Sequence, residues 1–278
     1  GRFSLWDHRI GEGCAVIEGN EDRMSPLEKR AYPLIFTVAV ISYVMSIVMS
    51  NEDFAQHWMI REDGMLESIT ALALLSASLL CGYRCWTLRH CRPKSFVLCT
   101  AAAAAVMFFG MGEEISWGQR IFNVESPEFF RANNVQYETN LHNLEIGGVR
   151  INKLIFGKVL AVVMVTYLLL PLWYQRSRAA RQFLNRLAVP VPRLHQILAI
   201  LAVVLLVETS GASKRGEINE FALSTTFLLI LLNPRNLWIF RPGLPPSSNE
   251  ADLQTLPFTP AQVAAGDASA SGSRRRTA

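Results

Sequence analysis

Hydrophobic residues in this chain occur in long continuous blocks rather than at amphipathic spacing. Blocks of this length predict helices surrounded by lipid, because they leave no polar face for water. The pattern predicts six membrane-spanning helices, at residues 31–49, 66–83, 95–111, 156–174, 194–207 and 221–232, the last extended by 238–240. The fifth and sixth blocks are short, and a buried or re-entrant helix is the alternative for each of them.

We therefore expect an all-α fold, a polytopic transmembrane bundle with a long outer loop between the third and fourth spans. The chain divides into a cytoplasmic polar arm (1–24), a transmembrane domain (25–241) and a C-terminal tail (242–278). The tail is rich in Pro, Ser, Ala and Gly and lacks periodicity, so we expect it to be disordered. Ser25 and Glu28 form a capping-box pattern that predicts the start of the first helix. The arm has no signal-peptide apolar run, so the first span is the expected targeting signal.

Charged residues are segregated between alternate loops. The second and fourth loops are rich in Arg and Lys and contain no Asp or Glu, whereas the first, third and fifth loops carry most of the acids. By the positive-inside rule, the basic loops and both termini are cytoplasmic, and the protein belongs in the cell membrane. The basic residues are spread through short membrane-flanking loops, which argues against nucleic acid as a partner and leaves the lipid bilayer as the expected one.

The segment 112–120, with the sequence GEEISWGQR, places two adjacent carboxylates at the end of the third apolar block. Ionisable groups there are costly unless they are paired, hydrated or used. If the third helix continues through this segment, Glu113, Trp117 and Arg120 lie on one stripe at i, i+4 and i+7. An ion pair between Glu113 and Arg120 and interfacial anchoring by Trp117 are the structural alternatives. Neither alternative accounts for Glu114.

The long outer loop supplies the remaining candidates. Glu138 and His142 are spaced at i, i+4, a ligand spacing suited to zinc or iron, so a divalent metal ion is the candidate cofactor. We expect His142 to fold back over the third helix and approach Glu113 or Glu114. Residues 126–128 predict a capped short helix that carries Phe129 and Phe130 in the membrane interface. The predicted catalytic residues are Glu113, Glu114, Arg120 and His142, the predicted metal ligands are Glu138 and His142, and the predicted substrate-binding residues are Trp117, Gln119, Asp63, Glu67 and Glu220.

One structural alternative competes with these roles. Acids at helix N-termini complement the helix dipole, which explains Asp63, Glu67, Glu217 and Glu220 without any function. The histidines of the basic side, His195 among them, are not candidates.

Three phrases of the chain, at 61–67, 113–120 and 138–143, resemble a group of uncharacterised bacterial multi-pass membrane proteins that share an EEISWGQR and ETNLHN signature. That resemblance implies a bacterial inner membrane and conveys no activity. The paired glutamates are also similar to the first motif, E-E-x-x-x-R, of the CAAX-protease-like (CPBP) intramembrane proteases. In this chain five residues separate Glu114 from Arg120 where that motif has three, and the F-x-x-x-H and H-x-x-x-N motifs of that family are missing from the sequence.

Three classes of function follow. A membrane-embedded hydrolase, with or without a metal ion, acting on a lipid or lipid-linked substrate would use Glu113 or Glu114 as general base, His142 and Glu138 as ligands or acid, and Arg120 for an anionic headgroup. A proton- or cation-coupled transporter would use the same acids as ion sites. A non-catalytic scaffold or assembly protein would use them as salt bridges. The hydrolase is the leading specific hypothesis, and the other two are its alternatives.

Overall fold

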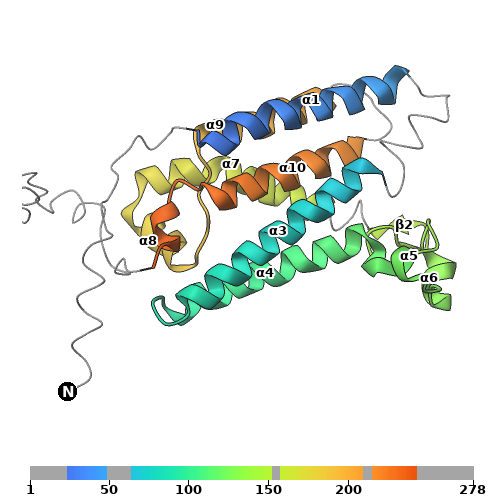
Figure 1. Ribbon diagram of the computed structural model, residues 1–278, viewed down its shortest axis with the longest axis horizontal. Coiled ribbons are helices and arrows are strands. Elements are labelled where there is room, and N and C mark those ends of the chain that lie inside the picture. The colour runs from blue at the N-terminus through green and yellow to red at the C-terminus, as the bar shows by residue number, and fades with distance from the viewer. Residues whose placement is uncertain (1–23, 49–63, 152–156, 209–214, 243–278) are drawn as a thin grey trace, which may run out of the picture. The chain divides into compact units, whose positions relative to one another are not determined.

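The computed structural model describes residues 24–48, 64–151, 157–208 and 215–242, and this part of the chain is almost entirely helical (Figure 1). The expected all-α class is therefore confirmed. The helices are α1 (Pro26–Val48), α3 (Met65–Leu88), α4 (Lys94–Glu114), α5 (Gln119–Phe122), α6 (Glu128–Asn133), α7 (Gly157–Arg176), α8 (Arg178–Arg186), α9 (Leu194–Glu208) and α10 (Arg215–Leu232). Two 3-10 helices, η2 (Ser116–Gly118) and η4 (Leu237–Phe240), and the strands β1 (Glu145–Ile146) and β2 (Val149–Arg150) complete them.

The six apolar blocks all form helices, which are α1, α3, α4, α7, α9 and α10. Within the described ranges, α3 and α4 are long and apolar enough to cross a membrane, and α9 is apolar but shorter. These two helices support a membrane location. The number of crossings and their orientation stay predictions.

Close helix packing is built on α3 and α10. Helix α3 packs against α4 and α10, and α10 also contacts α1 and α9. Small buried side chains on α3, such as Ala77 and Ser78, let the helices approach closely. The hydroxyl of Ser78 donates a hydrogen bond to the carbonyl oxygen of Ala104 on α4, at 2.8 Å. An apolar cluster joins α1, α3, α9 and α10 and includes Ile35, Leu66, Val207 and Phe221.

The first helix begins with the predicted capping box. The backbone nitrogen of Ser25 donates to Oε2 of Glu28 at 2.7 Å, and the backbone nitrogen of Glu28 donates to Oγ of Ser25 at 3.2 Å. The same carboxylate accepts hydrogen bonds from His195 and Gln196 on α9 and from Asn233, which follows α10. We call Glu28, His195, Gln196 and Asn233 the polar latch. It ties the start of α1 to two other helices.

Burial opposes ionisation of Glu28, but the hydrogen bonds from His195, Ser25, Gln196 and Asn233 outweigh it and lower the pKa of this carboxyl from 4.5 to about 2. Glu28 precedes the apolar run of α1 and is only 1% exposed. The latch therefore holds a buried negative charge at neutral pH.

The basic fourth loop contains helix α8, which was not predicted from the sequence. Ser177 caps this helix by accepting a hydrogen bond from the backbone nitrogen of Ala180, at 3.2 Å. Ala180 and Leu184 are buried, while Phe183 is 54% exposed. The amphipathic spacing of these residues was the sequence signal for the helix.

The structure also contains a β-hairpin that was not predicted from the sequence. Strands β1 and β2 pair antiparallel, with Ile146 opposite Val149. Gly147 and Gly148 form the two-residue turn with φ angles of 59° and 77°, a conformation that glycine adopts at low cost. The signal in the sequence was this Gly-Gly pair.

The predicted extension of the sixth span by residues 238–240 is wrong. Helix α10 ends at Leu232, and η4 follows after a turn. Asn236 lies in that turn, fully buried, and its side chain donates to the carbonyl oxygen of Val189 and accepts from the backbone nitrogen of Val191, both at 2.9 Å. Hydropathy alone does not predict that these hydrogen bonds of Asn236 interrupt the apolar segment.

Several predictions fall on residues outside the described ranges. They concern Asp63, the arm up to residue 23 and the disorder of the tail from residue 243. These stay predictions, and so do the domain boundaries at residues 24 and 242.

Candidate functional site

The paired glutamates lie at the last turn of α4, which ends at Glu114. The helix does not continue through Arg120, so the condition for Glu113, Trp117 and Arg120 to lie on one stripe is not met. Ser116 and Trp117 take φ angles of 46° and 55°, which reverse the chain. The indole of Trp117 folds back over Gly112, where an added Cβ would stand 2.8 Å from the ring. The missing side chain of Gly112 makes room for this fold.

Glu113 fastens the outer loop to the end of α4. Its Oε1 accepts a hydrogen bond from Nε1 of Trp117 at 2.9 Å, and its Oε2 accepts from the backbone nitrogens of Leu141 and His142 at 2.6 and 3.1 Å. The side chain is buried, with the residue only 5% exposed. His142 thus returns to the end of α4, where its backbone nitrogen makes the hydrogen bond. The expected approach of its ring to Glu113 or Glu114 stays a prediction.

His142 is half-buried beside Glu113. Burial lowers the pKa of its imidazole below the ordinary value, while the negative charge of Glu113 opposes that shift. The ring is therefore neutral at neutral pH, with one nitrogen able to accept a proton.

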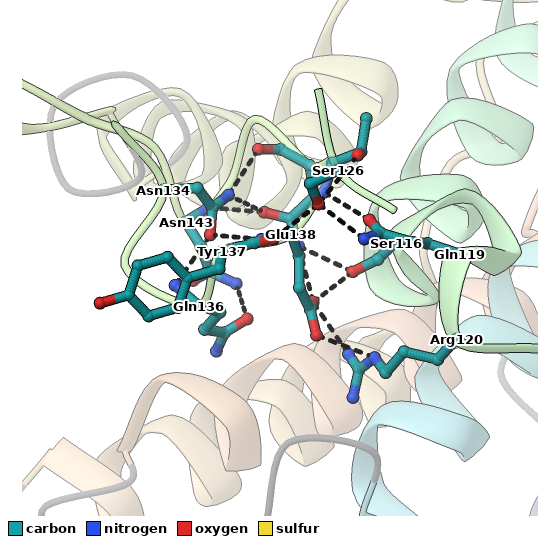
Figure 2. Close-up of polar contacts among 11 residues, drawn as sticks. Ser116, Gln119, Arg120, Ser126, Asn134, Gln136, Tyr137, Glu138 and Asn143 are labelled. Carbon is teal, nitrogen blue, oxygen red and sulfur yellow. Dashed lines mark hydrogen bonds and ion pairs between the residues drawn. The ribbon is translucent and has the colours of Figure 1, made fainter. Parts of the chain in front are cut away.

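Arg120 pairs with Glu138, so the alternative ion pair with Glu113 is wrong (Figure 2). Its Nε lies 2.9 Å from Oε1 of Glu138, and its Nη2 donates to Oε2 at 3.0 Å. The hydroxyl of Ser116 donates to the same Oε2 at 2.5 Å and accepts from Nδ2 of Asn140 at 2.8 Å. Both oxygens of Glu138 are therefore occupied inside the loop.

A second group of polar side chains extends this arrangement, as Figure 2 shows. Gln119 donates to Oγ of Ser126 at 2.6 Å and accepts from the backbone nitrogen of Thr139 at 2.7 Å. Asn134 donates to the side-chain and backbone oxygens of Asn140, both at 2.9 Å. We call these residues the loop network: Ser116, Gln119, Arg120, Ser126, Asn134, Glu138 and Asn140.

The short helix α6 forms where it was predicted, but Ser126 does not cap it. The N-cap residue is Pro127, without a side-chain hydrogen bond, and the hydroxyl of Ser126 donates to the carbonyl oxygen of Tyr137 at 2.6 Å. Phe129 is 53% exposed and stacks edge-to-face on Phe130. Exposed aromatic rings on this helix fit the predicted position at a membrane interface.

Glu114 belongs to a different group of residues. It interacts electrostatically with Glu67 of α3 and with Glu217 and Glu220 of α10. Glu220 interacts in turn with Glu217 and Glu67. We call these four residues the carboxyl cluster. Two of the predicted substrate-binding acids, Glu67 and Glu220, thus lie near Glu114, and Glu217, which was not among the predicted site residues, joins them.

The predicted site therefore separates into two parts. One part holds the loop in place and consists of Glu113, Trp117, Gln119, Arg120 and Glu138. The other part is Glu114, which faces other acids. Across the described ranges, no group of three or more His, Cys, Asp or Glu side chains is placed to hold a metal ion. Metal binding by Glu138 and His142 stays a prediction, and the arrangement of the described side chains does not support it. The residues missed from sequence, Ser116, Ser126, Asn134 and Asn140, were signalled only by the high amide and hydroxyl content of the loop.

Substituting Gly112→Ala should displace the indole of Trp117 and weaken its hydrogen bond to Glu113. Overpacking of this kind costs about 1–3 kcal/mol of unfolding free energy, measurable in detergent micelles by thermal unfolding. Gly82→Ala is the matched control, because Gly82 also lies in a helix but an added Cβ meets nothing within 4 Å. Equal behaviour of the two variants would show that Trp117 does not pack on Gly112.

No protein family, no curated protein and no solved structure matches this chain in the comparisons made.

Proposed function

We propose that this chain is a multi-pass membrane protein that takes up and releases protons at the carboxyl cluster, as part of a proton-coupled carrier. The observation that carries the proposal is the convergence of Glu114 with acids from two other helices. In the proposed topology the six apolar helices cross the bilayer, both termini are cytoplasmic and the cluster lies at the outer boundary. The segregation of acidic and basic loops supports this orientation.

Like charges at the mouth of a membrane helix favour proton binding over full ionisation. Four half-buried carboxylates close to one another repel, and sharing protons among them removes that repulsion. Among the described residues, neither Glu114 nor Glu220 forms an ion pair with a basic side chain. These acids are also not arranged to chelate a metal ion. A proton is therefore the cation that the cluster suits best.

The cluster joins elements that could move relative to one another. Glu114 ends α4, Glu67 lies in the first turn of α3, and Glu217 and Glu220 lie at the start of α10. Gaining or losing a proton changes the repulsion between these helix ends. Protonation would in this way favour one helix arrangement over another, which is the requirement for coupling protons to transport.

A membrane-embedded hydrolase acting on a lipid or lipid-linked substrate is the second proposal. The observation that favours it is the return of His142 to the end of α4. There its backbone nitrogen contacts Glu113, the residue that precedes Glu114 in the sequence. The neutral ring of His142 would be the general base, and protonated Glu114 would be the acid, which reverses the roles expected from the sequence. Glu113 and Arg120 are poor candidates for catalysis because the loop already uses their hydrogen-bonding groups.

Labelling with dicyclohexylcarbodiimide, which modifies protonated carboxyl groups in apolar surroundings, tests the proton site. We expect modification of the peptides that contain Glu114 or Glu220, decreasing as the pH rises, and its loss in Glu114→Gln. Glu125→Gln is the control, because Glu125 is exposed and lies outside the cluster. Mass spectrometry of the purified protein gives the modified positions.

Two variants, Glu114→Gln and His142→Ala, separate the two proposals. If the protein is a proton carrier, His142→Ala keeps the carbodiimide labelling, and of the two variants only Glu114→Gln loses proton uptake in reconstituted vesicles. A hydrolase loses turnover in both variants. If no carboxyl of the cluster is modified at any pH while the protein stays folded, the proton site does not exist.

A further inference from the structure

Helix α8 is a short, basic, amphipathic helix that follows α7 directly. Its buried positions are Ala180 and Leu184. Leu184 packs with Leu170 and Tyr174 of α7 in one apolar cluster. The hydroxyl of Tyr174 also donates a hydrogen bond to the side-chain oxygen of Asn185, at 3.3 Å. These contacts hold one face of α8 against α7 and so determine which of its side chains face outward.

The outward face of α8 carries arginines at helical spacing. Arg178, Gln182 and Arg186 follow one another at i, i+4 and i+8, and all three are exposed. In the part of the chain that the structure describes, no carboxylate forms an ion pair with Arg178 or Arg186. The loop from residue 175 to residue 193 contains no Asp or Glu. We call Arg178, Gln182 and Arg186 the arginine stripe, a positively charged surface without an acid of its own.

The second basic loop adjoins one end of this stripe. The hydroxyl of Ser95, at the start of α4, donates to the backbone carbonyl oxygen of Arg186 at 3.4 Å. The residue before it, Lys94, is exposed, and the loop from residue 84 to residue 94 also lacks acids. Two basic loops that lie far apart in the sequence therefore meet at the end of α8, which increases the positive potential there.

Two aromatic rings border the arginine stripe. Phe183 of α8 is 54% exposed, Trp173 of α7 is 50% exposed, and their ring centroids lie 6.4 Å apart. Val162, Leu169 and Trp173 share one face of α7, and Val165 adjoins it; all of these side chains are exposed. Lipid chains cover an apolar helix face of this kind, and an aromatic residue at its end is typical of the membrane interface.

We propose that the arginine stripe, Phe183 and Trp173 form a binding surface for an anionic phospholipid. The headgroup phosphate pairs with Arg178 and Arg186, and the acyl chains lie along the exposed apolar face of α7. One phospholipid molecule supplies both the negative charge and the hydrocarbon that this surface needs. A zwitterionic lipid fits less well, because its ammonium group would also lie near the arginines. The inference rests on the membrane location of the protein and shares no residue with the carboxyl cluster.

Quenching of tryptophan fluorescence by brominated phospholipids tests the surface in the full-length protein reconstituted in bilayers. The signal of Trp173 is the difference between the unmodified protein and Trp173→Phe. At low salt, brominated phosphatidylglycerol should bind at Trp173 about thirtyfold more tightly than brominated phosphatidylcholine, the factor that two arginines near an anionic surface supply. This preference should disappear in the double variant Arg178→Gln with Arg186→Gln and should decrease as the salt concentration rises.

The matched control is Arg131→Gln with Lys158→Gln, which removes the same charge from α6 and from the opposite end of α7. This control should keep the preference, and so should Arg178→Lys with Arg186→Lys, which retains both charges. Equal quenching by the two lipids, or a preference that survives loss of both arginines of α8, would overturn the proposal.

Quenching of Trp173 by neither lipid would mean that another protein chain covers this face, which would also overturn the proposal. Glu114→Gln should keep the full preference for phosphatidylglycerol. Failure of the proton site and failure of the lipid surface are therefore distinguishable, because each is measured in a variant that leaves the other intact.

Discussion

Replacing Glu28 by Ala should lower the free energy of unfolding by about 3–5 kcal/mol, the cost of breaking a buried, charged, hydrogen-bonded group. The substitution removes the acceptor for His195, Gln196 and Asn233 together, so α1 loses its polar connection to α9 and to the end of α10. It also removes one half of the capping box that starts α1. Equilibrium unfolding in mixed micelles of a mild detergent and dodecyl sulfate measures the change.

The matched control is Lys29→Ala, which alters the adjacent, exposed residue and should change the unfolding free energy by less than about 0.5 kcal/mol. A loss below about 1 kcal/mol for Glu28→Ala would contradict the latch, because the three side-chain donors would then have found other partners.

The pH dependence of stability follows from the same residue. Folding lowers the pKa of Glu28 from 4.5 to about 2, so the folded state holds this carboxylate ionised more firmly than the unfolded state does. The stabilisation is present above pH 4.5 and is lost as the pH falls towards 2, amounting to about 3 kcal/mol. Glu28→Gln should be less stable at neutral pH and should lack this part of the acid transition.

Replacing Glu113 by Ala should detach the outer loop from α4. Three hydrogen bonds to this carboxylate disappear, two of them from the backbone nitrogens of Leu141 and His142. Hydrogen bonds to charged groups contribute about 1.5–3 kcal/mol each, so the expected loss is at least about 3 kcal/mol. Limited proteolysis should cleave the variant within residues 119–145 much faster than the unmodified protein.

Glu125→Ala serves as the comparison. Its carboxylate is 91% exposed and lies 4.0 Å from Arg131, a contact that contributes little to stability. If Glu113→Ala resists the protease as well as Glu125→Ala does, the loop is held by Arg120 and Glu138 rather than by Glu113. The roles given to Glu113 and Glu114 of segment 112–120 would then have to be revised.

Much of the helical structure could be predicted from the sequence. The apolar blocks form helices where hydropathy placed them, and the Ser25–Glu28 box forms as expected, because both depend on residues within a few positions of one another. The prediction failed at the end of α4. Reversal of the chain at Ser116 and Trp117 needs positive φ angles that neither residue favours, and contacts formed only in the folded chain stabilise them.

The candidate site shows the same division. The sequence placed reactive residue types on the outer loop and predicted that His142 returns to α4. It could not assign partners, because Arg120 had two acids within reach and the fold selected Glu138 over Glu113. Glu113 accepts from Leu141 and His142, 28 and 29 residues away, and no local pattern encodes such a pairing.

By itself, the sequence determined which segments are apolar, where most helices begin and end, and how charge divides between loops, since these depend on neighbouring residues. The tertiary structure alone decided which polar groups meet. Glu28 joins Asn233 across 205 residues, and Glu114 meets acids from α3 and α10. His195 likewise meets Glu28 and Tyr32 only because α9 packs beside the start of α1. Such encounters depend on the packing of whole helices, to which every residue in the interface contributes.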